Sequence, residues 1–148
     1  MRLGLICIAA IALSGCADKS ATADDLNTID LTIPGGRTIK VETMIDPKDQ
    51  LRGMMFRTSM QPGHGMLFIY REAGSHPHFM YQTLIPLDII WLDADRRILQ
   101  IVANAPPCKT QASKCPTYGP DEASKYVLEL AGGMAGTYGL KAGDQVRF

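Results

Sequence analysis

The chain has 148 residues, and 15 Lys or Arg residues balance 15 Asp or Glu residues, so its formal net charge at pH 7 is zero. Nucleic-acid binding needs clustered positive charge, so this balance gives no electrostatic basis for a nucleic-acid partner. The sequence also lacks a GxSxG nucleophile elbow, an HExxH zinc-protease helix and a phosphate-binding loop. We therefore expect no cofactor and none of these enzyme classes.

The N-terminus has the features of a bacterial lipoprotein signal peptide. One positive residue precedes an apolar stretch over residues 3–13, which is too short to span a bilayer. The motif Leu13-Ser14-Gly15-Cys16 is typical of a lipobox, so we expect residues 1–15 to be removed and Cys16 to be lipidated. The alternative is an ordinary cleaved signal with an incidental cysteine. Ala17 follows Cys16, which by the Gram-negative sorting rule favours a periplasm-facing anchor in the outer membrane.

The mature chain is expected to consist of a tether and one domain. Residues 16–27 are small and mostly polar, as in flexible linkers. Residues 28–148 then number about 120, enough for one hydrophobic core and not for two. The sequence therefore predicts a single compact domain held close to the membrane.

Short alternating apolar segments separated by turn residues predict a mainly β fold. Residues 28–33 and 37–44 are expected to form a hairpin around Pro34-Gly35-Gly36, and Asp46-Pro47 is a typical start for a short helix ending near Gly53. No β-α-β alternation and no internal repeat is visible. The further predicted strands cover residues 65–70, 87–93, 97–103, 125–130 and 145–148, with a helical turn in the Gly-rich segment 131–139.

The segment 79–93 is expected to hold the central strand. Residues 87–93 are apolar on both faces when alternate residues point to opposite sides, as in a strand covered on both sides. Asp88 is the exception, because an unsatisfied buried carboxylate costs several kcal/mol. Its expected partner is an Arg side chain, a set of backbone amides, or a ligand or substrate.

Polar residues around this strand predict a binding site. Arg52 ends the short helix and offers a planar two-point donor to an acidic group. Gln82 and Thr83 add neutral hydrogen-bonding groups just before Pro86, where a regular strand ladder is interrupted. With Asp88, these residues predict a non-catalytic module that binds a small polar ligand or an envelope protein.

Two further functions remain as alternatives. The first is a hydrolase-like enzyme with Asp88 as acid or base, for which Glu129 or Asp93 is a candidate second carboxylate only if the fold brings them together. The second is copper(I) handling by thioethers and imidazoles, although methionine also fills core space. The residues concerned are Met54, Met55, Met60, His64, Met66, His76, His78 and Met80.

Cys108 and Cys115 are expected to form a structural disulfide, because two cysteines this close in an exported chain most simply pair with each other. A redox-active pair is the alternative. The spacing is longer than the two-residue spacing of thiol oxidoreductases, and no helix start follows.

Several segments together resemble a known family. The motifs are RGMMFR (52–57), GMLFIY (65–70), FMYQTLIPLDIIWLD (79–93), PPC (106–108), CPTYG (115–119), YVLEL (126–130) and GDQV (143–146). The order and content of these motifs are similar to those of domain-of-unknown-function family 192, over roughly residues 28–148. The resemblance implies a compact, mostly β domain like a jelly-roll sandwich, and no established reaction.

Overall fold

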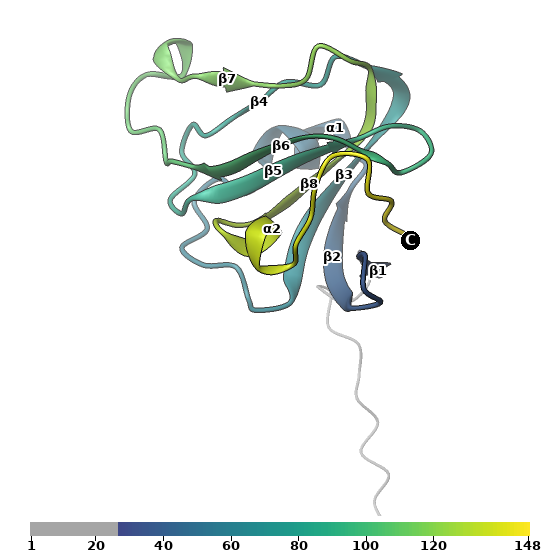
Figure 1. Ribbon diagram of the computed structural model, residues 1–148. Coiled ribbons are helices and arrows are strands. Elements are labelled where there is room, and N and C mark those ends of the chain that lie inside the picture. Colours follow the sequence, from purple (N-terminus) through teal and green to yellow (C-terminus); the bar gives the residue numbers. More distant parts are fainter. Residues whose placement is uncertain (1–26) are drawn as a thin grey trace, which may run out of the picture.

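The computed structural model describes residues 27–148 (Figure 1). The expected signal peptide, the lipidation site Cys16 and nearly all of the tether lie outside the described residues. No helix in the described part of the chain is both long and apolar enough to cross a membrane. The elements are β1 (Thr28–Thr32), β2 (Thr38–Met44), α1 (Pro47–Arg52), β3 (His64–Gly74), β4 (His78–Phe79), β5 (Leu87–Leu92), β6 (Ile98–Ala105), a 3-10 turn (Ala112–Lys114), β7 (Thr117–Tyr118), β8 (Ser124–Ala131) and α2 (Met134–Thr137).

The predicted mainly β fold with short helices is confirmed. Six strands form one sheet in the order β1-β2-β3-β8-β5-β6, and β4 pairs with β7 in a second, two-stranded sheet. The expected hairpin is present as β1 and β2, joined through Pro34-Gly35-Gly36. The expected helix is α1, in which the Asp46 carboxylate accepts a hydrogen bond from the Lys48 amide at 2.9 Å and Gly53 ends the helix.

Two expectations about connectivity are wrong. β2 and β3 are parallel and are joined by a crossover that contains α1, so one β-α-β unit does occur. Its helix has only six residues, too few for a helical periodicity to stand out in the sequence.

Residues 145–148 do not form a strand: Arg147 bridges only to Thr32 and Gln145 only to Arg97. This segment makes single bridges to the end of β1 and to the residue before β6, the two edge strands of the sheet, and it does not pair along either of them.

The central strand is confirmed, because all six residues of β5 are buried and β5 lies between β8 and β6. Its alternate residues belong to two separate cores. The core that includes Ala135 of α2 is here called the α2 face, and the core on the other side, next to α1, is called the α1 face. Buried residues of the α2 face include Leu31, Val41, Leu67, Ile90, Leu92, Leu128, Leu130, Ala135 and Val146; those of the α1 face include Met54, Met66, Phe68, Met80, Leu87, Ile89, Trp91 and Val127.

Candidate functional site

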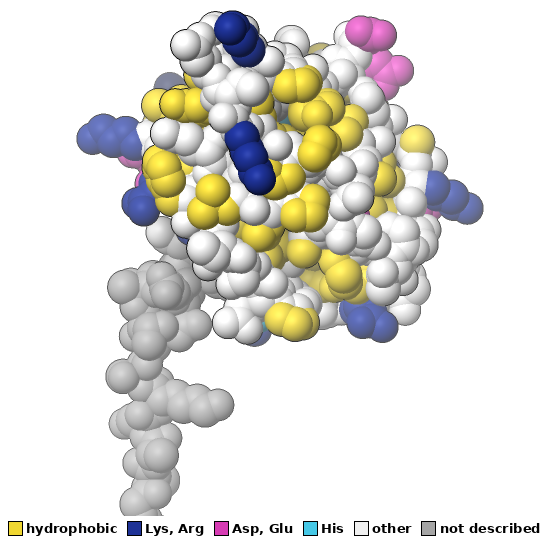
Figure 2. Space-filling model, turned by 90° about the vertical axis from the view of Figure 1, so that its left-hand side faces the viewer, with side chains coloured by type: hydrophobic (Ala, Val, Ile, Leu, Met, Phe, Trp, Pro, Cys, Tyr) yellow, Lys and Arg dark blue, Asp and Glu magenta, His cyan; other side chains and the backbone are white. Residues whose placement is uncertain are grey.

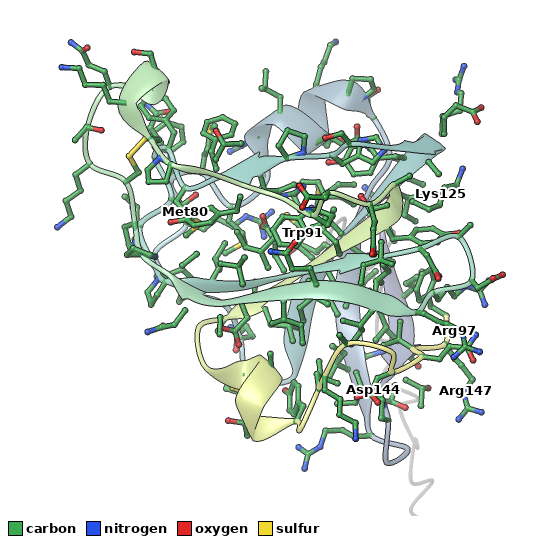
Figure 3. The ribbon with its side chains drawn as sticks, turned by 45° about the horizontal axis from the view of Figure 1, so that its top comes forward. Met80, Trp91, Arg97, Lys125, Asp144 and Arg147 are labelled. Carbon is green, nitrogen blue, oxygen red and sulfur yellow. A yellow bond between two sulfur atoms is a disulfide. The ribbon has the colours of Figure 1, made fainter. Side chains whose placement is uncertain are left out.

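A small cavity opens on the α1 face, between α1, β4 and the segment that leads into β5. Its volume is about 190 Å³. In Figure 3, Met80 and Trp91 lie between the main sheet and the β4/β7 layer, the region that the cavity adjoins. The lining residues are Gln50, Leu51, Arg52, Gly53, Met54, Met55, Phe68, Tyr70, Pro77, His78, Phe79, Tyr81, Thr83 and Glu129.

A chain of three hydrogen-bonded side chains forms the polar part of this cavity. Tyr70 of β3 lies with its hydroxyl 3.0 Å from Nε2 of His78, and Nδ1 of His78 lies 2.9 Å from Oε1 of Glu129. His78 is 8% exposed and Glu129 is 5% exposed. A carboxylate, an imidazole and a phenol are therefore joined in a nearly dry environment, where electrostatic interactions are strong.

The sheet register explains why Glu129 points into this cavity. On β8 it lies opposite Met66 of β3 and Ile89 of β5, which both belong to the core of the α1 face. Side chains that lie opposite one another in adjacent strands share a face. Glu129 is thus an inward-facing acid in an otherwise apolar row.

Aromatic contacts hold the imidazole in place. The His78 ring meets Phe68 edge-on with a centroid distance of 4.6 Å, and His76 stacks on Tyr70 at 3.5 Å. The indole Nε1 of Trp91 donates to the carbonyl of His76 at 2.8 Å, which anchors the segment leading into β4. The orientation of His78 is therefore set by packing as well as by its two hydrogen bonds.

The protonation of Tyr70 follows from its environment. Burial, together with the charge of Glu129, raises the pKa of Tyr70 to about 12, so its phenol is neutral at physiological pH. A neutral phenol can donate to Nε2 of His78, and Nδ1 of His78 faces Oε1 of Glu129. Both ring nitrogens of His78 therefore have a hydrogen-bond partner.

One atom of the network lacks a partner. Oε2 of Glu129 is buried and makes no hydrogen bond to any of the residues that the structure describes. A buried polar atom left unsatisfied costs roughly 1–3 kcal/mol, and more when it is charged. Glu129 also lines the cavity, so the cavity adjoins a buried carboxylate oxygen that has no hydrogen-bond partner among the described residues.

The structure brings together some of the polar residues singled out in the sequence. Arg52 and Thr83 both line the cavity, with Arg52 exposed and Thr83 buried. Gln82 lies beside it, in a neighbouring cavity of about 330 Å³ that shares Tyr81 and Thr83. Gln82 has a left-handed backbone (φ 55°), and its carbonyl accepts a hydrogen bond from the Phe56 amide at 2.9 Å. Strained backbone of this kind often borders a binding site.

Asp88 does not lie with these residues. It is fully buried on the α2 face, and its carboxylate accepts hydrogen bonds from the amides of Asn104 (2.7 Å), Gly133 (2.9 Å) and Ala135 (2.6 Å). Of the protein partners considered for Asp88, the structure shows the backbone amides and not Arg52. Asp88 does not line the cavity and both of its oxygens accept hydrogen bonds from the chain, so it lies apart from the candidate site, and its role as a ligand-binding residue stays a prediction.

The cysteine prediction is confirmed, since Cys108 and Cys115 form a disulfide. Met54, Met66 and Met80 are buried together in the core of the α1 face, where they pack with Phe68 and Trp91, whereas His64 at the start of β3 is exposed. Within residues 27–148, no group of three or more His, Cys, Asp or Glu side chains could hold a metal ion.

Sequence reasoning missed the network as a unit. Glu129 was considered only as a partner for Asp88, His78 only as a copper ligand, and Tyr70 not at all. The available signal was an acidic residue at an inward position of the alternating segment 125–130. The network itself could not be read from spacing, because Glu129 and His78 are 51 residues apart.

The fold and site together define a single mainly β domain with a small, partly polar cavity on one face of its sheet. The chain belongs to the DUF192 family, described as Uncharacterized ACR, whose profile matches residues 29–148. No curated protein matches the chain.

Two solved structures are similar to this chain. One is a protein of unknown function from Novosphingobium aromaticivorans DSM 12444, with 31% identity and a TM-score of 0.74 over 82% of this chain and 85% of the other. The second is a protein from Sinorhizobium meliloti 1021 provisionally named as a transcription regulator, with 34% identity and a TM-score of 0.70 over 80% of this chain and 89% of the other. The likeness therefore covers nearly the whole described domain.

Proposed function

We propose that the mature chain is a lipid-anchored, periplasm-facing module that binds a small polar ligand in the cavity of the α1 face. The observation that carries this proposal is the unpartnered Oε2 of Glu129. A ligand that donates a hydrogen bond to this oxygen would offset the cost of burying it. Folding alone gives no reason to keep a charged atom there, whereas binding does.

The surroundings of the cavity support a binding role. Leu51 is 70% exposed and Phe79 is 39% exposed, and both line the cavity. Figure 2 shows hydrophobic side chains gathered on the side of the molecule where β5 begins and β6 ends. An apolar opening above a few polar groups is typical of a small-molecule site.

An enzyme that uses Glu129 as acid or base is the second candidate function. It rests on the same unpartnered carboxylate oxygen of a residue that lines the cavity. The two-carboxylate arrangement of glycoside hydrolases does not fit, because Glu129 and Asp88 lie on opposite faces of the sheet. A binding role needs no second catalytic group.

The binding role is tested by screening sugars, amino acids, amines and small carboxylates for thermal stabilisation of the fragment 17–148. We expect at least one compound class to raise the melting temperature of the wild type and not that of Glu129→Gln. Glu72→Gln is the matched control, because Glu72 is an exposed glutamate on β3. If no compound stabilises the wild type, or if both variants respond like it, the cavity is not the binding site.

Membrane anchoring is tested separately. Replacement of Cys16 by Ala removes the predicted lipidation site, so fractionation of cells should find the variant in the soluble periplasmic fraction and the wild type in the membrane fraction. Membrane association of both forms would contradict the anchor.

A further inference from the structure

We propose that the cavity of the α1 face selects organic cations, and that a protonated amine is the group that binds Oε2 of Glu129. This inference rests on the proposed binding function and adds the chemical class of the ligand. It follows from the charge inside the cavity and from the aromatic rings around it.

The buried acidic group of the cavity is Glu129. It is the only Asp or Glu side chain among the described residues that line the cavity, and only one of its oxygens has a hydrogen-bond partner, Nδ1 of His78. Among the described residues that line the cavity, Arg52 has the only positively charged side chain, and it is exposed. Water screens an exposed charge much more than a buried one.

Aromatic residues line the same cavity as this carboxylate. Phe68, Tyr70, Phe79 and Tyr81 all line the cavity. The rings of Phe79 and Tyr81 stack with a centroid distance of 6.4 Å and an interplanar angle of 21°. Aromatic faces attract cations and contribute more where water is excluded, and cages of this type recognise ammonium groups.

The other ligand classes fit less well. A carboxylate or phosphate would be repelled by Glu129, and a neutral alcohol could donate a hydrogen bond but would leave the charge uncompensated. A charge-assisted hydrogen bond from an ammonium group is about twice as strong as a neutral one. A metal ion would need several oxygen or nitrogen ligands, and the described residues provide no cluster of three acidic, histidine or cysteine side chains.

The volume of the cavity limits the size of the ligand group that can enter it. A volume of about 190 Å³ accommodates a small head group and not a large molecule. Arg52, exposed in the lining of the cavity, can pair with an acidic group elsewhere on the same ligand. A small zwitterion or an amine at the end of a larger molecule satisfies both conditions.

The test uses three probes of the same shape: cyclohexylmethylamine, cyclohexylmethanol and cyclohexanecarboxylate. Binding to the fragment 17–148 is followed at pH 7 by changes in amide chemical shifts during titration. We expect the amine to bind at least about tenfold more tightly than the alcohol, and the carboxylate not to bind. None of the probes is aromatic, so attraction between a ring of the protein and a ring of the ligand does not contribute.

Two variants assign the effect to the cavity. Glu129→Gln should weaken amine binding by about tenfold or more and leave alcohol binding within about threefold, whereas the control Glu72→Gln should change neither. Phe79→Leu keeps an apolar side chain at a partly exposed position and should also weaken amine binding, because it removes one aromatic face. The second variant keeps the test valid if Glu129→Gln does not fold.

The outcomes separate the two proposals. Equal affinity for amine and alcohol, or amine binding that neither variant weakens, would overturn the inference about cations. If the compound screen finds a neutral or anionic ligand that depends on Glu129, the binding function stands and the cation preference is wrong. If neither the screen nor the probes show binding at this site, both proposals fall.

Discussion

Two buried carboxylates on neighbouring strands differ in how their oxygens are satisfied. Asp88 of β5 lies on the α2 face and accepts hydrogen bonds from three backbone amides. Glu129 of β8 lies on the α1 face, accepts one hydrogen bond from His78, and has a second oxygen without a partner in the described chain. Both oxygens of Asp88 are hydrogen-bonded within the protein, whereas Glu129 keeps one oxygen that can accept a hydrogen bond from another molecule.

The difference shows that burial alone does not identify a functional acid. Asp88 is the more deeply buried of the two, at 0% exposed against 5% for Glu129. Its partners are amides at the start of α2 and near the end of β6, so its carboxylate holds these two backbone segments in place. The number of unsatisfied oxygens, and not the depth of burial, distinguishes the functional candidate.

The largest expected effect on stability is that of Asp88→Asn. In Asn, an NH₂ group replaces one carboxylate oxygen and faces a backbone N–H group that now donates to Asp88. The hydrogen bonds that remain no longer go to a charged group, and such bonds contribute about 1.5–3 kcal/mol each. We expect the free energy of unfolding to fall by about 3 kcal/mol or more, measured by urea denaturation of the fragment 17–148. A loss below about 1 kcal/mol would show that the three amides do not depend on the charge.

A smaller loss in the free energy of unfolding is expected when a substitution displaces the backbone around Asp88 and leaves its carboxylate unchanged. A Cβ atom at Gly132 would clash with Oδ1 of Asn104 and would approach the carbonyl carbon of Pro86 to 3.2 Å. Gly132→Ala should therefore cost about 1–3 kcal/mol in the same urea assay. Gly136→Ala is the control, because a Cβ atom there meets nothing within 4 Å; an equal loss at both positions would contradict the packing argument.

On the other face, Tyr70→Phe should cost about 1–2 kcal/mol at neutral pH, because it leaves Nε2 of the buried His78 without its partner. The pKa of Tyr70 is raised from 10.0 to about 12 in the folded protein, so the folded state holds this proton more tightly than the unfolded state. The stabilisation is complete below pH 10 and is lost as the pH rises toward 12. The difference in unfolding free energy between wild type and variant should therefore shrink from pH 8 to pH 11, and a constant or growing difference would contradict this.

Local features of the fold could be predicted from the sequence, and long-range features could not. The cap at Asp46, the turn at Pro34-Gly35-Gly36 and the two-faced burial of β5 each depend on neighbouring residues or on simple alternation. The insertion of β8 between β3 and β5 depends on which strands meet in space, and this insertion brings Glu129 to His78. Arg52 was singled out as a charged residue at the end of a helix and Thr83 as a polar residue before Pro86, and both line one cavity. Backbone amides were among the partners expected for Asp88, but alternation gives only the face of its side chain and not which amides approach it.

Glu129→Gln should change the free energy of unfolding least of all these variants. It is the direct counterpart of Asp88→Asn on the other face of the sheet. Both substitutions convert a buried carboxylate to an amide of the same shape. Gln at position 129 can still accept a hydrogen bond from His78 through Oε1, and its amide group would replace an oxygen that has no partner among the described residues.

We expect the free energy of unfolding of Glu129→Gln to stay within about 1 kcal/mol of the wild type, or to rise, because an uncompensated buried charge is removed. Urea denaturation of both variants under one set of conditions measures the contrast. A loss as large as that of Asp88→Asn would mean that Glu129 is needed for folding, and the free oxygen would no longer argue for a ligand. A small loss or a gain means that the chain keeps a charge that its own stability does not require, as expected for a group retained for binding.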